Sequence, residues 1–210
     1  MSEAKRKDLL IWVDLETTGL DVADQMQGVH KHKILEVGMH ITDSKLNIID
    51  KGFEIIINHK KEDLEAVMND FVKDMHTKSG LLDKVYNSSF PLAVAEKMMV
   101  AYVESFNIEP KSSPICGNNV SFDKNFLDAQ MPEFTKLLHY RKMDVSSFKE
   151  FVIREYPEVG DMVQKQMKHR GLEDIKESID ELKLYKQYVF IPTNEVQQEL
   201  KSNKKIKPSI

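Results

Sequence analysis

The stretch that decides the fold is LLIWVDLETTGL, residues 9–20. Its first seven residues are apolar or aromatic apart from one acid, which predicts a buried β-strand over 9–15. Because strand side chains alternate between the two faces, Asp14 and Glu16 project from the same face, about 6.6 Å apart along the strand. Two acids at the end of an apolar strand favour a hard divalent cation that compensates their charge. An exposed acidic pair is the alternative that this pattern leaves open by itself.

Working outward from this strand, the sequence predicts one layered α/β domain. Residues 43–45 read as a turn between two further strand-like runs, so we expect a three-strand meander. Apolar residues then recur at helical spacing in three later segments, with a short strand between the first and second. The expected strands are 34–42, 46–57 and 115–116, and the expected helices are 92–106, 146–155 and 172–188. We expect the domain at 8–190, between an N-terminal extension, 1–7, and a polar, basic, loosely ordered tail, 191–210.

The composition limits the classes of function. The chain has 210 residues, of which 41% are hydrophobic, and its formal charge of −4 argues against a basic groove that grips long nucleic acid. We therefore expect any nucleic-acid ligand to be short. We expect neither a membrane span nor a secretory signal. The single cysteine, Cys116, excludes an intramolecular disulfide and favours the cytoplasm, and it leaves a mitochondrial location open.

A third acid follows the short strand at 115–116. Gly117 turns the chain into a helix that carries Asp123 near its start, one turn from two apolar residues that face the core. Asp123 should therefore lie at the edge of the core and not far out in solvent. Compensation of the helix dipole is the alternative reading of an acid at this position.

His169 and Asp174 are the last pair. On one regular helix they would lie about 140° apart, so they cannot converge from such a helix. Gly171 predicts that the helix begins there, with His169 on the preceding loop and Asp174 in the first turn. A loop histidine opposite fixed carboxylates suits a general base, and an ordinary exposed histidine is the alternative.

Taken together, these motifs resemble the DEDDh exonuclease superfamily: VDLETTGL at 13–20, CGN at 116–118 with Asp123 after it, and His169 with Asp174. Within that superfamily, three further motifs resemble the oligoribonucleases: HTKSGL at 76–81, SPICGN at 113–118 and HYRKMDVS at 139–146. The likeness covers about residues 8–190, with the motifs in the same order and at matching spacing.

The resemblance implies an RNase H-like mixed β-sheet flanked by helices in a single domain. It also implies a homodimeric 3′-to-5′ exoribonuclease that degrades short oligoribonucleotides, especially dinucleotides, to mononucleotides. Two divalent cations, Mg²⁺ or Mn²⁺, would bind Asp14, Glu16, Asp123 and Asp174, and His169 would take the proton of the attacking water. No Cys/His cluster indicates zinc.

The resemblance also assigns substrate contacts. Leu20 and Phe71 would contact the two bases, and Tyr140 and Arg141 of the partner subunit would cap the 5′ phosphate. The remaining predictions are that His76 orders the substrate loop, that Asn119 contacts a phosphate and that Asp144 caps the helix that follows it.

Two departures from the family pattern concern access and phosphate binding. The stretch 22–32 is longer than the short turn expected between the first two strands, and Asn119 stands where the family usually has serine. Whether Asn119 makes the phosphate contact of that serine is therefore open, although the Asn119 amide can still donate a hydrogen bond. Two alternative functions are a DNA-trimming or proofreading exonuclease of the same superfamily, which substrate length would distinguish, and a non-enzymatic nucleotide-binding protein.

Overall fold

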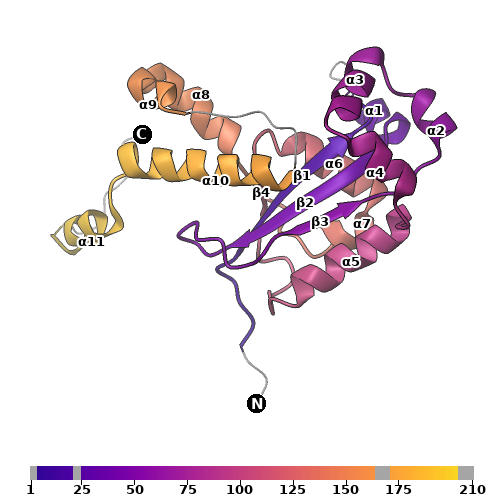
Figure 1. Cartoon of the computed structure of the whole chain (residues 1–210). Helices are drawn as coiled ribbons and strands as arrows, with labels where there is room; N and C mark the ends of the chain where they lie inside the picture. The colour runs from indigo at the N-terminus through magenta and orange to yellow at the C-terminus, as the bar shows by residue number, and fades with distance from the viewer. Residues whose placement is uncertain (1–3, 21–24, 164–170, 203–210) are drawn as a thin grey trace.

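A five-stranded mixed sheet forms the centre of the chain in a computed structural model that describes residues 4–20, 25–163 and 171–202. The strand order is β3-β2-β1-β4-β5, with helices on both faces (Figure 1). The strands are β1 (Leu10–Thr17), β2 (Ile34–Thr42), β3 (Phe53–Ile56), β4 (Ile115–Gly117) and β5 (Lys142–Asp144). The predicted α/β class, a single mixed sheet with flanking helices, is confirmed.

The register of the sheet places the acids of β1. Strands β1, β2 and β3 form the predicted antiparallel meander, in which Glu16 lies opposite Glu36. Strand β4 runs parallel to β1, with Ile11 opposite Ile115, and β5 runs parallel to β4. The carboxyl ends of β1, β4 and β5 therefore meet at one edge of the sheet, as in other parallel arrangements that bind ligands there.

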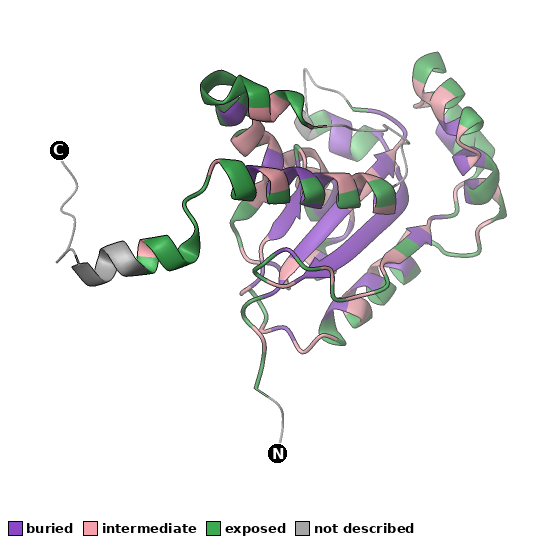
Figure 2. Ribbon diagram, turned by 60° about the vertical axis from the view of Figure 1, so that its left-hand side comes forward, coloured by how far each residue is buried: buried purple, intermediate pink, exposed green. Residues whose placement is uncertain are grey.

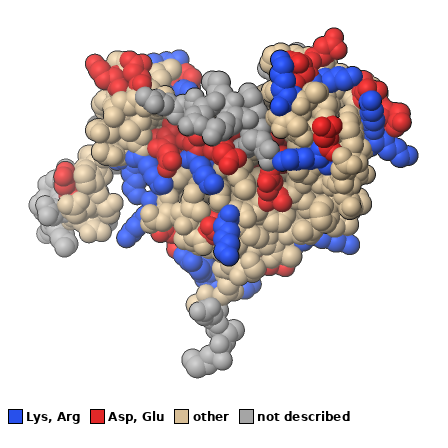
Figure 3. Space-filling model, viewed as in Figure 1, with Lys and Arg blue, Asp and Glu red and all other residues tan. Residues whose placement is uncertain are grey.

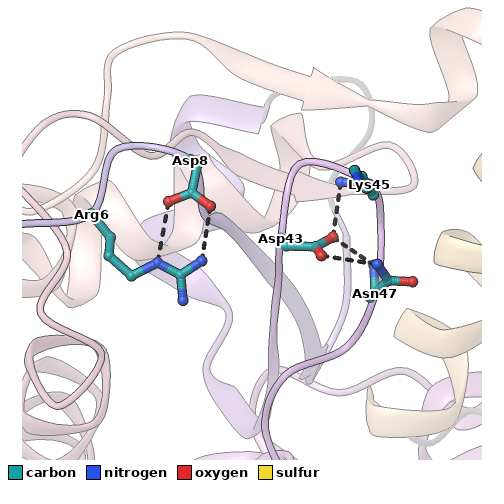
Figure 4. Close-up of polar contacts among 5 residues, drawn as sticks. All are labelled: Arg6, Asp8, Asp43, Lys45 and Asn47. Carbon is teal, nitrogen blue, oxygen red and sulfur yellow. Dashed lines mark hydrogen bonds and ion pairs between the residues drawn. The ribbon is translucent and has the colours of Figure 1, made fainter. Parts of the chain in front are cut away.

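The prediction of a strand over 46–57 was wrong for the first half of that range. The Asp43 carboxylate accepts hydrogen bonds from the backbone N–H groups of Lys45 and Asn47 and from the Asn47 amide, which closes a turn (Figure 4). Ile48 then forms only an isolated bridge with Thr42, and β3 begins later, at Phe53. Side chain to backbone hydrogen bonds of Asp compete with strand pairing, which explains the shorter strand.

Eleven helices are described along the chain, and three of them match helices whose ranges were predicted from the sequence. The predicted helices 92–106, 146–155 and 172–188 are confirmed as α5, α8 and α10, each with ends within two residues of the prediction. The described helices are α1 (Gln25–Lys31), α2 (Lys61–Glu65), α3 (Asp70–Lys78), α4 (Leu81–Asn87), α5 (Leu92–Glu104), α6 (Ser121–Gln130), α7 (Pro132–Thr135), α8 (Val145–Glu155), α9 (Pro157–Asp161), α10 (Gly171–Tyr188) and α11 (Thr193–Ser202).

The two faces of the sheet carry separate apolar cores. On one face, Ile11 and Val13 of β1 pack in a cluster with residues of α5, α6 and α7. On the other face, Trp12 and Cys116 pack with residues of α8 and α10, and the Trp12 indole donates a hydrogen bond to Thr42 at 3.0 Å. Figure 2 shows that the centre of the sheet is buried, as β2 and β4 are along their whole length, while the outer sides of the helices are exposed. Helix α10 thus lies across the face from which Asp14 and Glu16 project.

Both terminal segments contain residues whose structure is described. Arg6 forms a bridge with Ile108 and an ion pair with Asp8, at 2.8 Å, so part of the N-terminal extension is attached to the domain (Figure 4). The tail expected to be loosely ordered contains the helix α11, which stands away from the sheet (Figure 1). Among the described helices, none is both long enough and apolar enough to cross a membrane.

Candidate active site

Carboxylates from three elements converge at the end of β1. Ligand oxygens of Asp14, Glu16 and Asp174 lie within 4.8 Å of one another. Asp123, in the first turn of α6, lies beside them and accepts a hydrogen bond from the backbone N–H of Leu15 at 3.0 Å. The structure therefore brings together the four acids that the sequence analysis selected.

Two glycines bring Asp174 to the strand. Gly171 begins α10, as predicted, and a Cβ built on Gly38 of β2 would lie 2.8 Å from the Gly171 carbonyl carbon. Because neither residue has a side chain, the first turn of α10 packs directly on the backbone of β2, and Asp174 reaches Asp14 from above the sheet. His169, the predicted base, lies outside the described residues.

The electrostatics of the site are unfavourable without a cation. Burial first, and then the neighbouring acids, raise the pKa of Asp14 well above its usual value. Burial also raises the pKa of Asp123 to about 7, although the hydrogen bond from Leu15 lowers it in part. Grouped buried acids of this kind are stabilised by a cation, and oxygen donors suit hard divalent ions. The site fits a divalent metal.

A fifth acid, Glu36, belongs to this cluster and was missed by the sequence analysis. It is fully buried opposite Glu16 in the register of β1 and β2, and its charge is among the causes that raise the pKa of Asp14. The available signal was a charged residue inside ILEVGMHIT, residues 34–42, an otherwise largely apolar strand. Charged residues are rarely buried in this way unless something pairs with them.

The turn between β4 and α6 is held by two carboxylates. The Asn118 amide donates to Glu181 of α10 at 2.9 Å, and the Asn119 backbone N–H donates to Asp144 at 2.9 Å. Asp144 also accepts from the Ser146 backbone N–H, so its predicted role as the cap of α8 is confirmed. Asn119 has a φ of 55° and is exposed at the rim of the site, and its contact with a phosphate stays a prediction.

A cavity of about 160 Å³ lies next to the carboxylates. Its lining combines metal-type ligands with apolar and amide side chains: Asp14, Leu15, Thr17, Leu20, Asn118, Asn119, Phe122, Asp123 and Phe126. Leu20 is 51% exposed at this position. An apolar side chain beside a carboxylate cluster suits a ligand with both a flat apolar part and an anionic part.

The predicted contacts on α3 differ in exposure. Phe71 is 77% exposed, which leaves its ring accessible to a ligand. His76 is buried, its Nε2 lies 2.9 Å from the Thr17 carbonyl oxygen, and its Nδ1 lies 3.9 Å from a carboxylate oxygen of Glu16. His76 therefore contacts the end of β1 behind the carboxylates, and its role in ordering the substrate loop stays a prediction.

Tyr140 and Arg141 lie just before β5. Tyr140 is 75% exposed, the Arg141 guanidinium lies 5.3 Å from the centre of its ring, and Arg141 Nε donates to the Tyr140 hydroxyl at 3.0 Å. In the sheet register Arg141 is level with Leu10, four residues before Asp14, or roughly 13 Å along the strand direction. The two residues thus begin at the end of the sheet opposite the carboxylates.

Comparison with known proteins gives one matching family model and many similar sequences. The RNase T model, described as exonuclease, matches residues 11–182. The oligoribonuclease of Corynebacterium diphtheriae is 41% identical over 201 residues, which cover 94% of this chain and 92% of the relative. The oligoribonuclease of Rhodococcus jostii is 39% identical over 187 residues, which cover 89% and 90% of the two chains.

Similar solved structures support the fold. The Mg²⁺- and Mn²⁺-bound form of S. pombe Pop2p has a TM-score of 0.66 at 13% identity and covers 86% of this chain and 84% of that one. Cell-death related nuclease 4 has a TM-score of 0.60 at 12% identity and covers 87% and 64% of the two chains. At this level of identity the likeness concerns the arrangement of strands and helices alone.

Proposed function

This chain belongs to the exonuclease family whose model it matches over residues 11–182, and from that premise we propose its activity. It is a 3′-to-5′ exoribonuclease that degrades short oligoribonucleotides, especially dinucleotides, to mononucleotides. Similarity to curated oligoribonucleases over about nine-tenths of the chain supports this substrate class. The observation that carries the proposal is the convergence of Asp14, Glu16 and Asp174 beside Asp123.

Two divalent cations, Mg²⁺ or Mn²⁺, are the cofactors in this proposal, and the four acids hold them. When bound, such cations activate a water molecule and neutralise the charge of the leaving oxygen. His169 takes the proton from the attacking water, and its place five residues before Asp174 in the sequence supports that role. His169→Ala should lower kcat by roughly 10²–10⁴-fold, whereas a loss below tenfold would remove the base from the mechanism.

The exposed apolar residues support a short substrate. Leu20 lines the cavity beside the acids, and Phe71 exposes a ring that can stack on a base. On the face drawn in Figure 3, the described basic side chains are interspersed with acidic ones and form no continuous band. Long RNA would need such a band, because phosphate contacts dominate the affinity for long nucleic acid.

We propose a homodimer in which Tyr140 and Arg141 cap the 5′ phosphate in the partner's site. Their start at the opposite end of the sheet from their own carboxylates supports a contact with the other subunit. Arg141 offers a planar fork of donors that suits a phosphate, which lysine does not reproduce.

Mixed dimers test this arrangement. Arg141→Ala chains and Asp14→Asn chains should each be nearly inactive on 5′-phosphorylated dinucleotides, and mixing them should restore activity in one site of each heterodimer. Mixing Asp14→Asn with Asp174→Asn is the matched control. Each of these chains lacks a metal ligand of its own site, so neither site of the heterodimer is intact. If heterodimers form and the first mixture is as inactive as the control, the cap does not act between subunits.

The cytoplasm is the proposed location. Cys116 is a free, buried thiol, and burial raises its pKa, so it is unreactive in the reducing conditions of that compartment.

Product analysis with 5′-phosphorylated RNAs of two to twenty nucleotides tests the activity. We expect kcat/KM to be highest for the dinucleotide, mononucleotides to be the products, and EDTA to abolish turnover. Comparable rates on long single strands, or faster hydrolysis of DNA, would instead indicate a trimming exonuclease. No turnover of any RNA with Mg²⁺ or Mn²⁺ would contradict the proposed function.

A further inference from the structure

A buried polar network in α10 ends in the candidate active site. Asp174, Ser178, Glu181 and Tyr185 are spaced four, three and four residues apart, so they share one face of the helix. The last three are buried, although serine, glutamate and tyrosine are usually partly exposed. The same face of α10 thus carries a carboxylate of the site at its start and a buried carboxylate two turns further on.

Glu181 is bonded at both carboxylate oxygens. Tyr185 donates its hydroxyl to Oε1 at 2.6 Å, and the Asn118 amide nitrogen donates to Oε2 at 2.9 Å. Burial and the neighbouring carboxylate raise the pKa of Tyr185, so its hydroxyl stays protonated and remains a donor. A buried network whose members are satisfied in this way holds one arrangement of its side chains.

This network fixes the orientation of the Asn118 amide. An ionised carboxylate only accepts hydrogen bonds, so the nitrogen of the amide must face Glu181 and its oxygen must point elsewhere. Asn118 is half-buried and lines the cavity that also contains Asp14 and Asp123. Its Oδ1 accepts no hydrogen bond from the described residues, since its one side-chain bond is the donation to Glu181.

A fixed acceptor in that cavity suits a hydroxyl group of the ligand. The carboxylates of the cavity are the proposed cation ligands, and the Thr17 hydroxyl donates to the Gly19 carbonyl. Asn118 and Asn119 both line the cavity, and within the described residues Asn118 is the one whose amide a side-chain hydrogen bond orients, so we take it as the acceptor that the fold fixes and the cations do not use. A ribose 2′-hydroxyl can donate to it, and a deoxyribose cannot.

We infer that Glu181 and Tyr185 hold the Asn118 amide with its oxygen toward the cavity, where it accepts a hydrogen bond from a ribose 2′-hydroxyl of the substrate. This inference rests on the proposed function and adds a source of preference for RNA over DNA. Asn118 is a specificity residue in this account, and Glu181 and Tyr185 are positioning residues that act through it.

The test compares a 5′-phosphorylated diribonucleotide with its two singly 2′-fluoro forms, which cannot donate from the substituted position. For the wild-type chain, fluorine at one of the two riboses should lower kcat/KM by about tenfold, the size of one hydrogen bond. In Asn118→Ala the all-ribose substrate should lose about tenfold, and the same fluorine should change kcat/KM by less than twofold. Where turnover of Asn118→Ala is too slow, Kd values measured with Ca²⁺ give the same comparison.

The positioning residues have their own controls. Glu181→Gln can donate to or accept from the Asn118 amide, so it should reduce the fluorine effect to about threefold, and Glu181→Leu should abolish it. Asp180→Asn changes an exposed acid on the same helix and should leave the effect at its wild-type size. All three substrates are measured on one preparation of each variant, so any unfolded fraction cancels from the ratio of their kcat/KM values.

Two results would overturn the inference. One is a fluorine effect in Asn118→Ala that equals the wild-type effect at both riboses, and the other is a wild-type chain that is indifferent to fluorine at both. In each case hydrolysis of the diribonucleotide by the wild-type chain would leave the proposed function intact. Failure of the wild-type chain to hydrolyse the diribonucleotide would instead contradict the proposed function itself.

Discussion

On one face of β1 and β2, Val13, Val37 and Met39 are buried and pack in an apolar cluster with residues of the covering helices. On the opposite face of the same strands, Asp14 and Glu36 are covered almost as well, but their neighbours are other acids. The first face is stable by itself, because burial of apolar surface drives folding. The second face has an apolar core of its own around Trp12, but its acidic end needs a cation to offset the grouped charges, which is how a metal site differs from a core.

The largest expected effect comes from removing a ligand on the acidic face. Asp14→Asn or Asp174→Asn should lower turnover by about 10³-fold or more, since loss of a cation removes several kcal/mol of charge stabilisation. Melting temperature without metal should stay equal or rise, because one repelling charge is gone. Steady-state kinetics and thermal melts measure both. Turnover near wild type in either variant would remove the distinction between the two faces.

The matched change on the apolar face is Met39→Ala. It should lower the free energy of unfolding by about 2–5 kcal/mol, the usual result of truncating a buried side chain. Turnover per folded molecule should stay within about twofold of wild type, because Met39 points away from the acids. Urea denaturation and active-site titration separate the two quantities. A large loss of kcat in the folded fraction would show that the faces are coupled.

Gly38→Ala tests whether the close contact between β2 and the start of α10 places Asp174 in the acidic cluster. Ala at this position would place Cβ 2.8 Å from the Gly171 carbonyl carbon, so the start of α10 must move. A displacement of Asp174 by about 1 Å can reduce the rate by roughly 10²-fold. Gly160→Ala, where the added carbon would meet a side chain 3.1 Å away, is the control and should be nearly silent. Unchanged kcat in Gly38→Ala would mean that Asp174 is not placed by this contact.

The last expected effect is on the pH dependence of stability in the metal-free protein. Burial raises the pKa of Asp123 to about 7 in the folded state, so the folded chain binds this proton more tightly than the unfolded chain does. Stability from this group is fully present below pH 4 and is lost as the pH rises through 7. In EDTA, unfolding free energy should therefore fall by about 2–4 kcal/mol from pH 4.5 to pH 8 relative to Asp123→Asn. Parallel curves for the two proteins would contradict this.

The sequence predicted the parts of the fold that have a clear period or a clear breaker. The strand at 9–15 follows from its run of apolar and aromatic residues, and the helix start follows from Gly171. The convergence of Asp14 with Asp174 was implied by the family resemblance and not by the local pattern of residues. The helices at Gln25–Lys31 and Asp70–Lys78 were missed, since short helices lack a long apolar stripe and are stabilised by tertiary contacts.

The missed site residues share one physical reason. Glu36 and Glu181 are buried acids whose neighbours lie on other elements. Glu36 lies opposite Glu16, 20 residues earlier in the sequence, and Glu181 accepts from Asn118, 63 residues earlier. Their environment depends on how strands and helices pack, which no local pattern reports. A charged residue within an apolar run was the one signal available for Glu36.

Calorimetric titration of the EDTA-treated chain with Mn²⁺ at pH 7.5 tests most directly whether the acidic face is a metal site. We expect two equivalents to bind per wild-type chain and at least one to be lost in Asp14→Asn and in Asp174→Asn. Asp180→Asn, an exposed acid on α10, should bind as the wild type does. Absence of binding to the wild-type chain, or equal binding by Asp14→Asn, would contradict the central claim that the converged carboxylates hold the cations of a nuclease.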